Sequence, residues 1–406
     1  MPETRVAILG AAFSANRGAA SMLQAVIDNL PDRLGPCRFS VLTTYPADDR
    51  VEAGEVPSVT VVSARPVELA LLLWPLALLA AGLRRVRLPW RWLCRPPALR
   101  HLRDADVVVD VAGISFADGR GAPIVIYNAL MTSLPLLLGR PTVKASQAMG
   151  PFRSRLNRTL ARLVLPRLRA VCARGAATER HLAELGLTNV EPAADLAFTM
   201  HMPADAVVTN ARPTVGLAPS AVVKGYCDRA GIDYVALFAG LADRILDSGR
   251  DVVVFPHSSR RRVTGGRMDD RPVTRAVHER CPRARLVDDP LGPVALRGLI
   301  AGFDLLVTSR FHAMISALAT TTPVLVVGWS HKYDEVLAEI GLEGCAVDWS
   351  ATGADSLAAR AVALLDDAPA VRSTIEQALP AVTARSARNY EVIASAAARK
   401  GGTACT

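Results

Sequence analysis

Two residues of the C-terminal half, Arg310 and His312, combine anion binding with proton transfer. The apolar run 304–308 before them has the length and composition of a buried parallel strand, and a helical pattern over 312–321 follows. Free backbone N–H groups and the helix dipole attract anions at such a strand-to-helix corner. Arg310 adds a guanidinium fork for phosphate or carboxylate, and His312 supplies a proton that moves near neutral pH. With Ser309, these residues predict a group-transfer site.

A structural interpretation of the same corner stays open. Arg310 can form an internal salt bridge, and His312 can be a polar residue in the first turn of the helix. Further cations follow neighbouring strands and could bind the same anion, although a solvated surface side chain is the alternative for each. These additional candidates are His257, Arg260, Lys224 and Lys332.

No metal is expected at this corner. Asp269 and Asp270 stand close to the arginine run that begins at Arg260, and we interpret them as balancing its charge. No histidine or carboxylate partner has the spacing of a metal-ligand set. We therefore expect chemistry without a metal or a cofactor.

The first loop of the chain, residues 10–18, is a second candidate binding element. Gly10 and Gly18 allow the backbone to approach a ligand closely, and Asn16 and Arg17 offer donors beside the start of a helix. A glycine-bearing turn after a first strand is also common in proteins without such a site.

Polar side chains end two further strands of the N-terminal half. Asp110, followed by Gly113, could accept hydrogen bonds from sugar hydroxyls or act as a base, and could equally cap the next turn. Gln147 precedes the turn imposed by Gly150 and Pro151, which lets it project from the end of its strand.

Strand and helix patterns alternate along the whole chain, which predicts an α/β protein with parallel sheets and right-handed crossovers. The pattern restarts after a joint near residues 202–213, so we expect two doubly wound, Rossmann-like domains facing a cleft. The expected domains are 1–205 and 206–380, followed by a C-terminal helix and tail over 381–406. The expected strands are 4–9, 38–43, 59–62, 106–111, 142–146, 170–173, 214–218, 251–255, 284–287, 304–308 and 323–327; the expected helices include 18–30, 234–248, 296–301 and 312–321.

Composition describes a soluble globular chain of 406 residues, with 50% hydrophobic and 21% charged residues. The formal charge of +9 favours anionic partners. Nucleic acid is excluded from our expectation because aromatic residues make up only 5% and no nucleic-acid-binding pattern occurs. GxGxxG and P-loop motifs are also absent from the sequence.

The 7 cysteines are scattered and never form a C-x-x-C pair, which indicates a reducing compartment rather than a disulfide framework. The N-terminal residues lack a basic region followed by an apolar core, so no secretory signal is expected. We predict a cytoplasmic protein, with the inner face of the membrane as a further possible location.

One apolar segment, residues 67–83, interrupts the pattern and contains Glu68 and Pro75. A strongly basic stretch with two tryptophans follows it. An apolar stretch beside arginine and tryptophan could contact an acidic membrane surface through residues 67–92. The alternative is a buried helix or an insertion, within 67–103, that covers the N-terminal sheet. A transmembrane span is not expected, because the segment is short and carries a proline.

Several segments occur together in one order: GAAFSANRGAASML, VDVAGISF, ASQAMGPF, ARGAATERHLAELGL, ADLAF, VVVFPHSS and SRFHAMISALATTTPVLVVGWSHKYDEVLAEIGL. Through them the chain resembles the polysaccharide pyruvyl transferases, over residues 4–345. The most specific part is the R-x-H corner of Arg310 and His312, followed by the strand from Pro323 and by Lys332.

The resemblance implies a pair of domains like those of GT-B glycosyltransferases. It also implies transfer of an enolpyruvate-derived unit from phosphoenolpyruvate to two hydroxyls of a sugar, which gives a pyruvate ketal and phosphate. In that family the arginine of R-x-H binds the donor and the histidine does acid–base work. The implied donor ligands are Arg310, Lys332, His257, Arg260, Lys224 and Ser309; the implied acceptor ligands are Asn16, Arg17, Gly18, Asp110, Gly113 and Gln147.

The acceptor stays open, because departures from the family pattern concentrate in the N-terminal half. Asn16-Arg17-Gly18-Ala19 stands where many relatives have Asn-x-Gly-Asp. A sugar, a nucleotide sugar or a lipid-linked glycan precursor all fit, and the oligomeric state is not predicted. Two other functions remain: a nucleotide-sugar glycosyltransferase on the same fold, and a non-catalytic, membrane-associated partner in envelope assembly.

Overall fold

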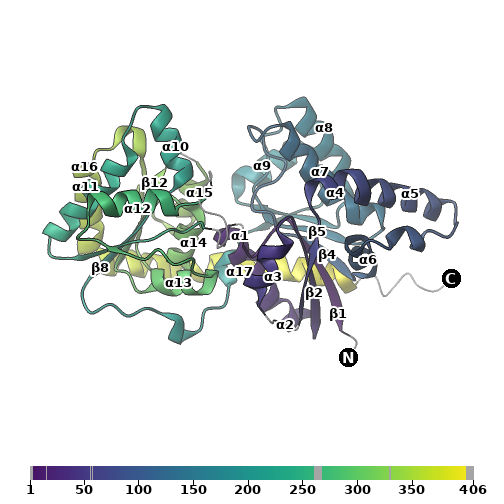
Figure 1. Cartoon of the computed structure of the whole chain (residues 1–406), viewed down its shortest axis with the longest axis horizontal. Helices are drawn as coiled ribbons and strands as arrows, with labels where there is room; N and C mark the ends of the chain where they lie inside the picture. Colours follow the sequence, from purple (N-terminus) through teal and green to yellow (C-terminus); the bar gives the residue numbers. More distant parts are fainter. Residues whose placement is uncertain are drawn as a thin grey trace. The chain divides into compact units, whose positions relative to one another are not determined.

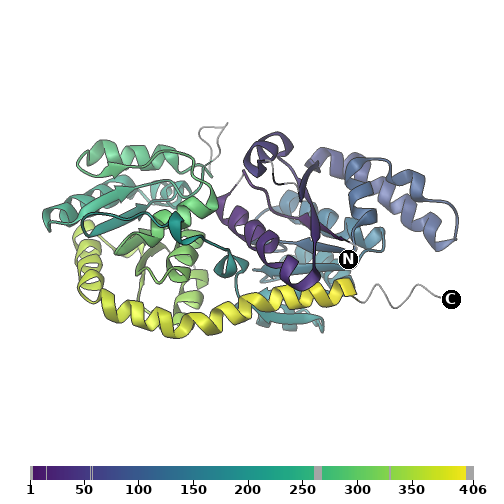
Figure 2. The ribbon, with the colours of Figure 1, turned by 90° about the horizontal axis from the view of Figure 1, so that it is seen from below.

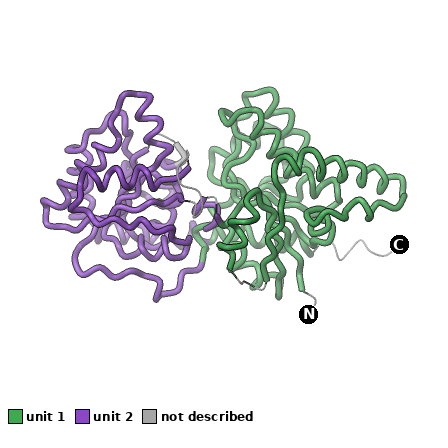
Figure 3. Tube along the Cα trace, viewed as in Figure 1, with its two compact units in different colours: residues 1–13, 22–200, 384–406 green, residues 14–21, 201–383 purple. Residues whose placement is uncertain are grey.

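The chain folds into two compact α/β units in the computed structural model, which describes residues 3–14, 16–54, 56, 58–259, 268–328 and 331–398, with only the backbone given for 331 and 332. Unit 1 comprises residues 1–13, 22–200 and 384–406, and unit 2 comprises residues 14–21 and 201–383 (Figure 3).

The sheet of unit 1 has seven strands in the order β3-β2-β1-β4-β5-β6-β7, and neighbouring strands pair in parallel. Its strands are β1 (Thr4–Leu9), β2 (Cys37–Thr43), β3 (Val59–Ser63), β4 (Val107–Asp110), β5 (Thr142–Gln147), β6 (Ala170–Arg174) and β7 (Val190–Ala193). The order reverses between β1 and β4, as in a doubly wound sheet.

Helices connect these strands, as the parallel pairing requires (Figure 1). They are α1 (Arg17–Asn29), α2 (Pro31–Leu34), α3 (Pro46–Ala53), α4 (Pro66–Glu68), η1 (Leu69–Leu73), α5 (Trp74–Arg85), η2 (Arg91–Cys94), α6 (Pro97–Asp104), α7 (Ala122–Leu137), α8 (Arg155–Val164), η3 (Leu165–Arg167), α9 (Ala176–Glu184) and η4 (Leu196–Thr199). The first turn of α1 is grouped with unit 2.

Unit 2 repeats the design with six parallel strands in the order β10-β9-β8-β11-β12-β13. The strands are β8 (Thr214–Ala218), β9 (Asp251–Val254), β10 (Arg285–Leu286), β11 (Leu305–Thr308), β12 (Val324–Gly328) and β13 (Ala346–Asp348). The helices are η5 (Ala204–Ala206), α10 (Ala221–Arg229), α11 (Tyr234–Asp247), α12 (Arg271–Arg280), α13 (Pro293–Ala301), α14 (Phe311–Ala319), α15 (His331–Ile340), η6 (Trp349–Ala351), α16 (Ala354–Asp366) and α17 (Ala368–Ala398).

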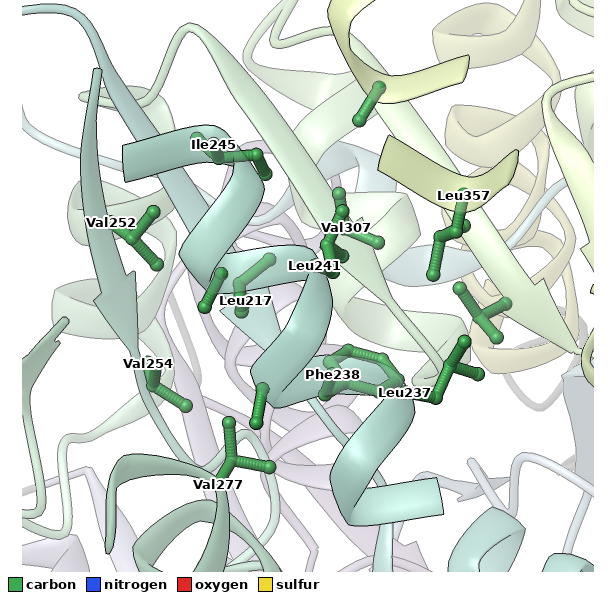
Figure 4. Close-up of a cluster of buried hydrophobic side chains, with 14 of the residues drawn as sticks. Leu217, Leu237, Phe238, Leu241, Ile245, Val252, Val254, Val277, Val307 and Leu357 are labelled. Carbon is green, nitrogen blue, oxygen red and sulfur yellow. The ribbon is translucent and has the colours of Figure 1, made fainter. Parts of the chain in front are cut away.

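The core of unit 2 lies between its sheet and α11, which buries Phe238 and Leu241 against Leu217 of β8 and Val307 of β11 (Figure 4). Burial of these side chains removes a large apolar area from water and holds the ends of β8 and β11 in place. The rigid sheet thus provides a firm base for the loops at its carboxyl edge.

The expected α/β class and the two doubly wound sheets are confirmed. The expected strands match observed ones to within about two residues at each end, whereas the edge strands β7 and β13 were not expected. Both are short, at four and three residues, and lie at the edge of their sheets, where the apolar pattern is weak.

Grouping of the chain ends differs from the expected domain limits. Residues 14–21 are grouped with unit 2, although the remainder of α1 is grouped with unit 1. The long helix α17, continuous in Figure 2, belongs to unit 2 up to residue 383 and to unit 1 from residue 384. In unit 1 its Asn389 side chain donates to Ser146 Oγ at 2.7 Å, which ties the helix to the end of β5.

The apolar segment after β3 forms one helical stretch over residues 66–85, made of α4, η1 and α5. By length and composition it could cross a membrane, with a mean hydropathy of 1.9, although core helices pass the same test. One face is buried in the core of unit 1 through Leu69, Leu73, Ala77 and Ala80. The expected covering helix is therefore correct for this face, while the other face is exposed.

Candidate active site

The carboxyl edge of the unit 2 sheet gathers most of the predicted donor-side residues. The strand order changes direction between β8 and β11, and ligands of doubly wound sheets bind at such a switch point. The segment after β9 carries His257, and the segment after β11 carries Ser309, Arg310 and His312. The sequence therefore predicted correctly that these residues share one edge.

Arg310 forms a bidentate ion pair with Asp270, which is fully buried. Arg310 Nε donates to Asp270 Oδ2 at 2.8 Å, and Nη2 donates to Oδ1. The backbone N–H groups of Ala221 and Ser258 also donate to this carboxylate, at 2.9 and 2.8 Å. Four N–H donors thus converge on one side chain, which connects the loops after β8, β9 and β11.

Burial raises the pKa of Asp270, while Arg310 and the two backbone amides act in the opposite direction. The structural interpretation of Arg310 is therefore correct as far as it goes. A guanidinium has a second edge, however, and the edge with Nη1 is not the one that holds Asp270. Arg310 can keep its ion pair and still bind an anion.

Ser309 is held by two tyrosines that the sequence did not indicate. Tyr234 Oη donates to Ser309 Oγ at 2.7 Å, and Tyr333 Oη donates to the Ser309 carbonyl oxygen at 3.0 Å. Burial raises the pKa of Tyr333 to about 12, so this phenol keeps its proton at neutral pH. Ser309 is itself buried, and its side chain serves to position the corner.

His312 lies in the first turn of α14, directly after the N-cap residue Arg310 and Phe311. Its ring packs edge-on against the Phe311 ring, with centroids 5.2 Å apart. It also packs against Gly18 at the start of α1: a Cβ atom built on Gly18 would lie 2.1 Å from His312 Nδ1. The absence of a side chain at Gly18 thus leaves space for the imidazole. This packing is sufficient to explain why residue 18 is a glycine, with no ligand involved.

The end of the first loop and the start of α1 are grouped with unit 2 and form part of this corner, whereas Gly10 lies in unit 1; the predicted acceptor role of the loop stays a prediction. Asn16 Oδ1 accepts from the Gly18 N–H at 3.0 Å, so the Asn16 side chain caps α1. Arg17 is the first residue of that helix and is completely buried.

His257 is the buried histidine of the same corner. It is 3% exposed, and its pKa lies well below the usual 6.5 because of burial and of the positive charges of His312, Arg310 and Arg17. Burial is the largest cause, and the three neighbouring groups add a positive potential. Such a potential favours an anionic ligand.

The other predicted cations are placed elsewhere or lie outside the described residues. Lys224 lies on α10 and pairs with Asp228 one turn later at 2.8 Å, as a surface ion pair. Arg260 is outside the described residues. Lys332 is in the first turn of α15, but its side chain is not described.

Asp110 and Gln147, the predicted acceptor ligands of unit 1, are buried and bonded to each other. Gln147 Nε2 donates to Asp110 Oδ1 at 2.8 Å, and Lys144 Nζ contacts Asp110 Oδ2 at 2.5 Å. Burial lowers the pKa of Lys144, while the Asp110 carboxylate acts in the opposite direction. In the structure the two side chains satisfy the buried Lys144, which the sequence pattern did not indicate, and their role at an acceptor stays a prediction.

Two other glycines frame this network. A Cβ on Gly10 would lie 2.7 Å from Asp110 Oδ1, so close packing explains Gly10. Gly113 accepts a backbone hydrogen bond from the Ala148 N–H at 3.2 Å and remains partly exposed. Gly113 is the predicted acceptor residue of unit 1 that stays accessible.

The corner also contains Asp270, Tyr234 and Tyr333, which the sequence pattern did not indicate. The sequence assigned Asp270 to charge balance without a partner, and nothing local distinguishes it from Asp269, which pairs with Arg271. No group of three or more histidine, cysteine, aspartate or glutamate side chains that could hold a metal occurs within the described part of the chain.

Comparisons with solved structures agree with this fold. The UDP-GlcNAc 2-epimerase of Neisseria meningitidis, bound to UDP-GlcNAc, superimposes with a TM-score of 0.58 at 10% identity, covering 97% of this chain and 100% of that one. Anabaena Alr3699/HepE, in complex with UDP and glucose, gives a TM-score of 0.52 at 12% identity, with 99% of each chain covered. At such low identity these similarities concern the fold alone.

Sequence comparisons are more specific. The amylovoran biosynthesis protein AmsJ of Erwinia amylovora is 22% identical over 409 residues, covering 92% of this chain and 95% of that protein. The family model of the polysaccharide pyruvyl transferases matches residues 16–331, which include the start of α1, the buried network of unit 1 and the corner of unit 2. The chain therefore belongs to the polysaccharide pyruvyl transferase family, and is a transferase of polysaccharide biosynthesis.

Proposed function

We propose that this transferase uses phosphoenolpyruvate as donor and forms a pyruvate ketal on two hydroxyls of a sugar or glycan precursor. The observation that carries the proposal is the gathering of Arg310, His312 and the buried His257 at the carboxyl edge of the unit 2 sheet, with Arg17 on the adjoining start of α1. Phosphoenolpyruvate carries a phosphate and a carboxylate, so its site needs several cations close together. Family membership supports the same assignment.

The proposed donor contacts follow from the corner. The Nη1 edge of Arg310 takes one anionic group, since Nε and Nη2 hold Asp270. The first-turn N–H groups of α14 add a partial positive charge to the same place. Arg17, His257 and Lys332 are further proposed donor ligands, while Ser309 and Asp270 position the corner.

The reaction balances without a further reactant. A proton added to the methylene carbon creates a methyl group and an oxocarbenium-like centre at the neighbouring carbon. One sugar hydroxyl oxygen bonds to that carbon, the C–O bond to phosphate breaks, and a second hydroxyl oxygen replaces it. Of the two hydroxyl protons, one replaces the proton given to the methylene carbon and one leaves with phosphate. We assign His312 as the acid for the methylene carbon or the base for a hydroxyl, with His257 as its neighbour.

A nucleotide sugar is the second candidate substrate. The related folds were solved with UDP-GlcNAc and with UDP and glucose. On this observation a nucleotide-linked sugar could be the acceptor of the pyruvyl unit, or the donor if the chain were a glycosyltransferase. Gly113, with its partly exposed backbone, is a proposed acceptor contact in unit 1.

Thermal-shift measurements separate these possibilities. Phosphoenolpyruvate should raise the melting temperature, because a ligand that binds only the folded state stabilises it. Stabilisation by a UDP-sugar and none by phosphoenolpyruvate would favour the glycosyltransferase and contradict our assignment.

Turnover is then followed as inorganic phosphate released when phosphoenolpyruvate is mixed with candidate acceptors. Mass spectrometry of the product should find the sugar enlarged by one pyruvate less one water. A product enlarged by a hexose instead identifies the rival reaction.

A further inference from the structure

The helical stretch over residues 66–85 presents an apolar face to solvent. Val67, Leu71 and Leu79 are 69%, 77% and 59% exposed. Leu72 and Leu78 are also exposed. The opposite face of the same stretch packs in the core of unit 1. The helix therefore cannot rotate to bury the exposed leucines without removing its packed face from that core.

The apolar surface continues beyond the helix. Val86, Leu88 and Trp92 are 63%, 53% and 58% exposed in the turn and the η2 segment that follow. Of the large hydrophobic side chains exposed among the described residues, eight lie between residues 67 and 92. Figures 1 and 2 both show α5 and this turn projecting from unit 1. Such concentration in a projecting element marks an interaction surface.

The segment that carries this apolar surface is rich in arginine and nearly free of acidic residues. Residues 64–100 contain seven arginines, with Glu68 as their only acidic residue. Glu68 accepts a hydrogen bond from Ser63 Oγ at 2.9 Å. Arg84, Arg85 and Arg87 are exposed at the end of α5 and just beyond it. The positive charge therefore remains available to an anionic partner.

We propose that this surface, residues 67–92, docks unit 1 on a bilayer that contains anionic lipids. Leucine side chains enter the boundary between headgroups and acyl chains, Trp92 lies at the headgroup level, and the arginines contact lipid phosphates. Charge complementarity favours a membrane over an apolar protein groove as the partner. An anionic lipid surface presents many phosphates in one plane, where they can contact the arginines around the apolar side chains.

The helix lies on the membrane and does not cross it. Leu69, Leu73, Ala77 and Ala80 are at most 1% exposed and belong to the core of unit 1. Trp74 Nε1 donates to Ser133 Oγ of α7 at 3.0 Å. Insertion across a bilayer would remove this face from the core, whereas surface docking leaves unit 1 intact.

Co-sedimentation of the full chain with vesicles tests the proposal independently of the reaction. Vesicles of phosphatidylcholine with phosphatidylglycerol should bind the protein, and binding should weaken in high salt and with pure phosphatidylcholine. The double variant Leu71→Asp/Leu79→Asp should bind at least about tenfold more weakly, because two charges enter the apolar boundary. Val51→Asp, at a side chain 50% exposed on α3, is the control and should bind like the wild type.

Charge is tested with a second pair of variants of equal net charge. Arg85→Glu/Arg87→Glu should weaken binding by at least about tenfold, since an anionic surface attracts each arginine and repels each glutamate. Arg169→Glu/Arg180→Glu, two exposed arginines elsewhere in unit 1, should change it far less. A blue shift of fluorescence on vesicle addition, lost in Trp92→Phe, should place that indole in the boundary.

Three results would overturn the proposal. Equal vesicle binding by both arginine pairs would mean that only net charge matters. A dimer in light scattering that Leu71→Asp/Leu79→Asp dissociates, together with no vesicle binding, would assign the surface to a second copy of the chain. Retention in membranes after alkaline carbonate washing would indicate a spanning helix.

Discussion

Gly18 and His312 are packed so closely that the imidazole occupies the space a side chain at residue 18 would need: Nδ1 lies 2.1 Å from an ideal Cβ position. The two residues come from opposite ends of the family match, the start of α1 and the start of α14. This contact makes the start of α1 part of the corner that carries the proposed chemistry.

Gly18→Ala should therefore displace the His312 ring and lower phosphate release toward the level of a His312 variant. The melting temperature should change little if the ring can rotate away. Gly225→Ala in α10 is the matched control, because the nearest atom to a Cβ built on Gly225, Nη1 of Arg229, lies 4.0 Å away. That change should leave activity intact and stabilise the fold by about 0.4–1 kcal/mol. Full activity of Gly18→Ala would refute the positioning role.

His312→Gln should slow turnover by about 10²–10⁴-fold if the imidazole transfers a proton. The affinity for phosphoenolpyruvate, measured by thermal shift, should fall much less. His278→Gln is the control: this histidine lies on α12 and its Nδ1 contacts the Ala284 carbonyl at 3.0 Å. An active His312→Gln enzyme would remove our mechanism.

Arg310→Lys should abolish donor binding, because an ammonium cannot hold Asp270 in bidentate geometry and present a second edge to an anion. We expect loss of the thermal shift with phosphoenolpyruvate. Lys224→Ala, which removes a surface ion pair on α10, should keep that shift. A thermal shift kept in Arg310→Lys and lost in Lys224→Ala would instead place the donor site at the surface of α10.

Asp270→Asn should destabilise unit 2 by about 3–5 kcal/mol, since breaking a buried ion pair leaves an uncompensated charge. Asp288→Asn, which breaks the partly exposed pair with Arg275, should cost about 0–1 kcal/mol. Urea unfolding of the two variants measures the difference. Similar costs for both would mean that Asp270 does not organise the three loops.

His257 predicts how stability depends on pH. Its folded-state pKa lies well below 6.5, so below about pH 6.5 the unfolded chain binds a proton that the folded chain does not. Stability should therefore fall as the pH decreases from about 7 to 5. His257→Gln should flatten this part of the melting-temperature profile. An unchanged slope would show that His257 is not held neutral by its surroundings.

Local pattern determined a large part of this protein. Apolar runs and helical periodicity were sufficient for the strands of both sheets other than the edge strands β7 and β13, because a buried strand and an amphipathic helix impose their period on neighbouring residues. The corner of Arg310 and His312 was also predictable, since it depends only on the junction between β11 and α14.

Tertiary structure alone decided which side chains meet. Asp270 pairs with Arg310, and Lys144 and Gln147 of β5 bond to Asp110 of β4, because the strand order brings together segments that are distant in the sequence. The same holds for Gly18 beside His312. Polar side chains at strand ends look alike in a sequence, and only burial separates those that satisfy one another from those that can face a substrate.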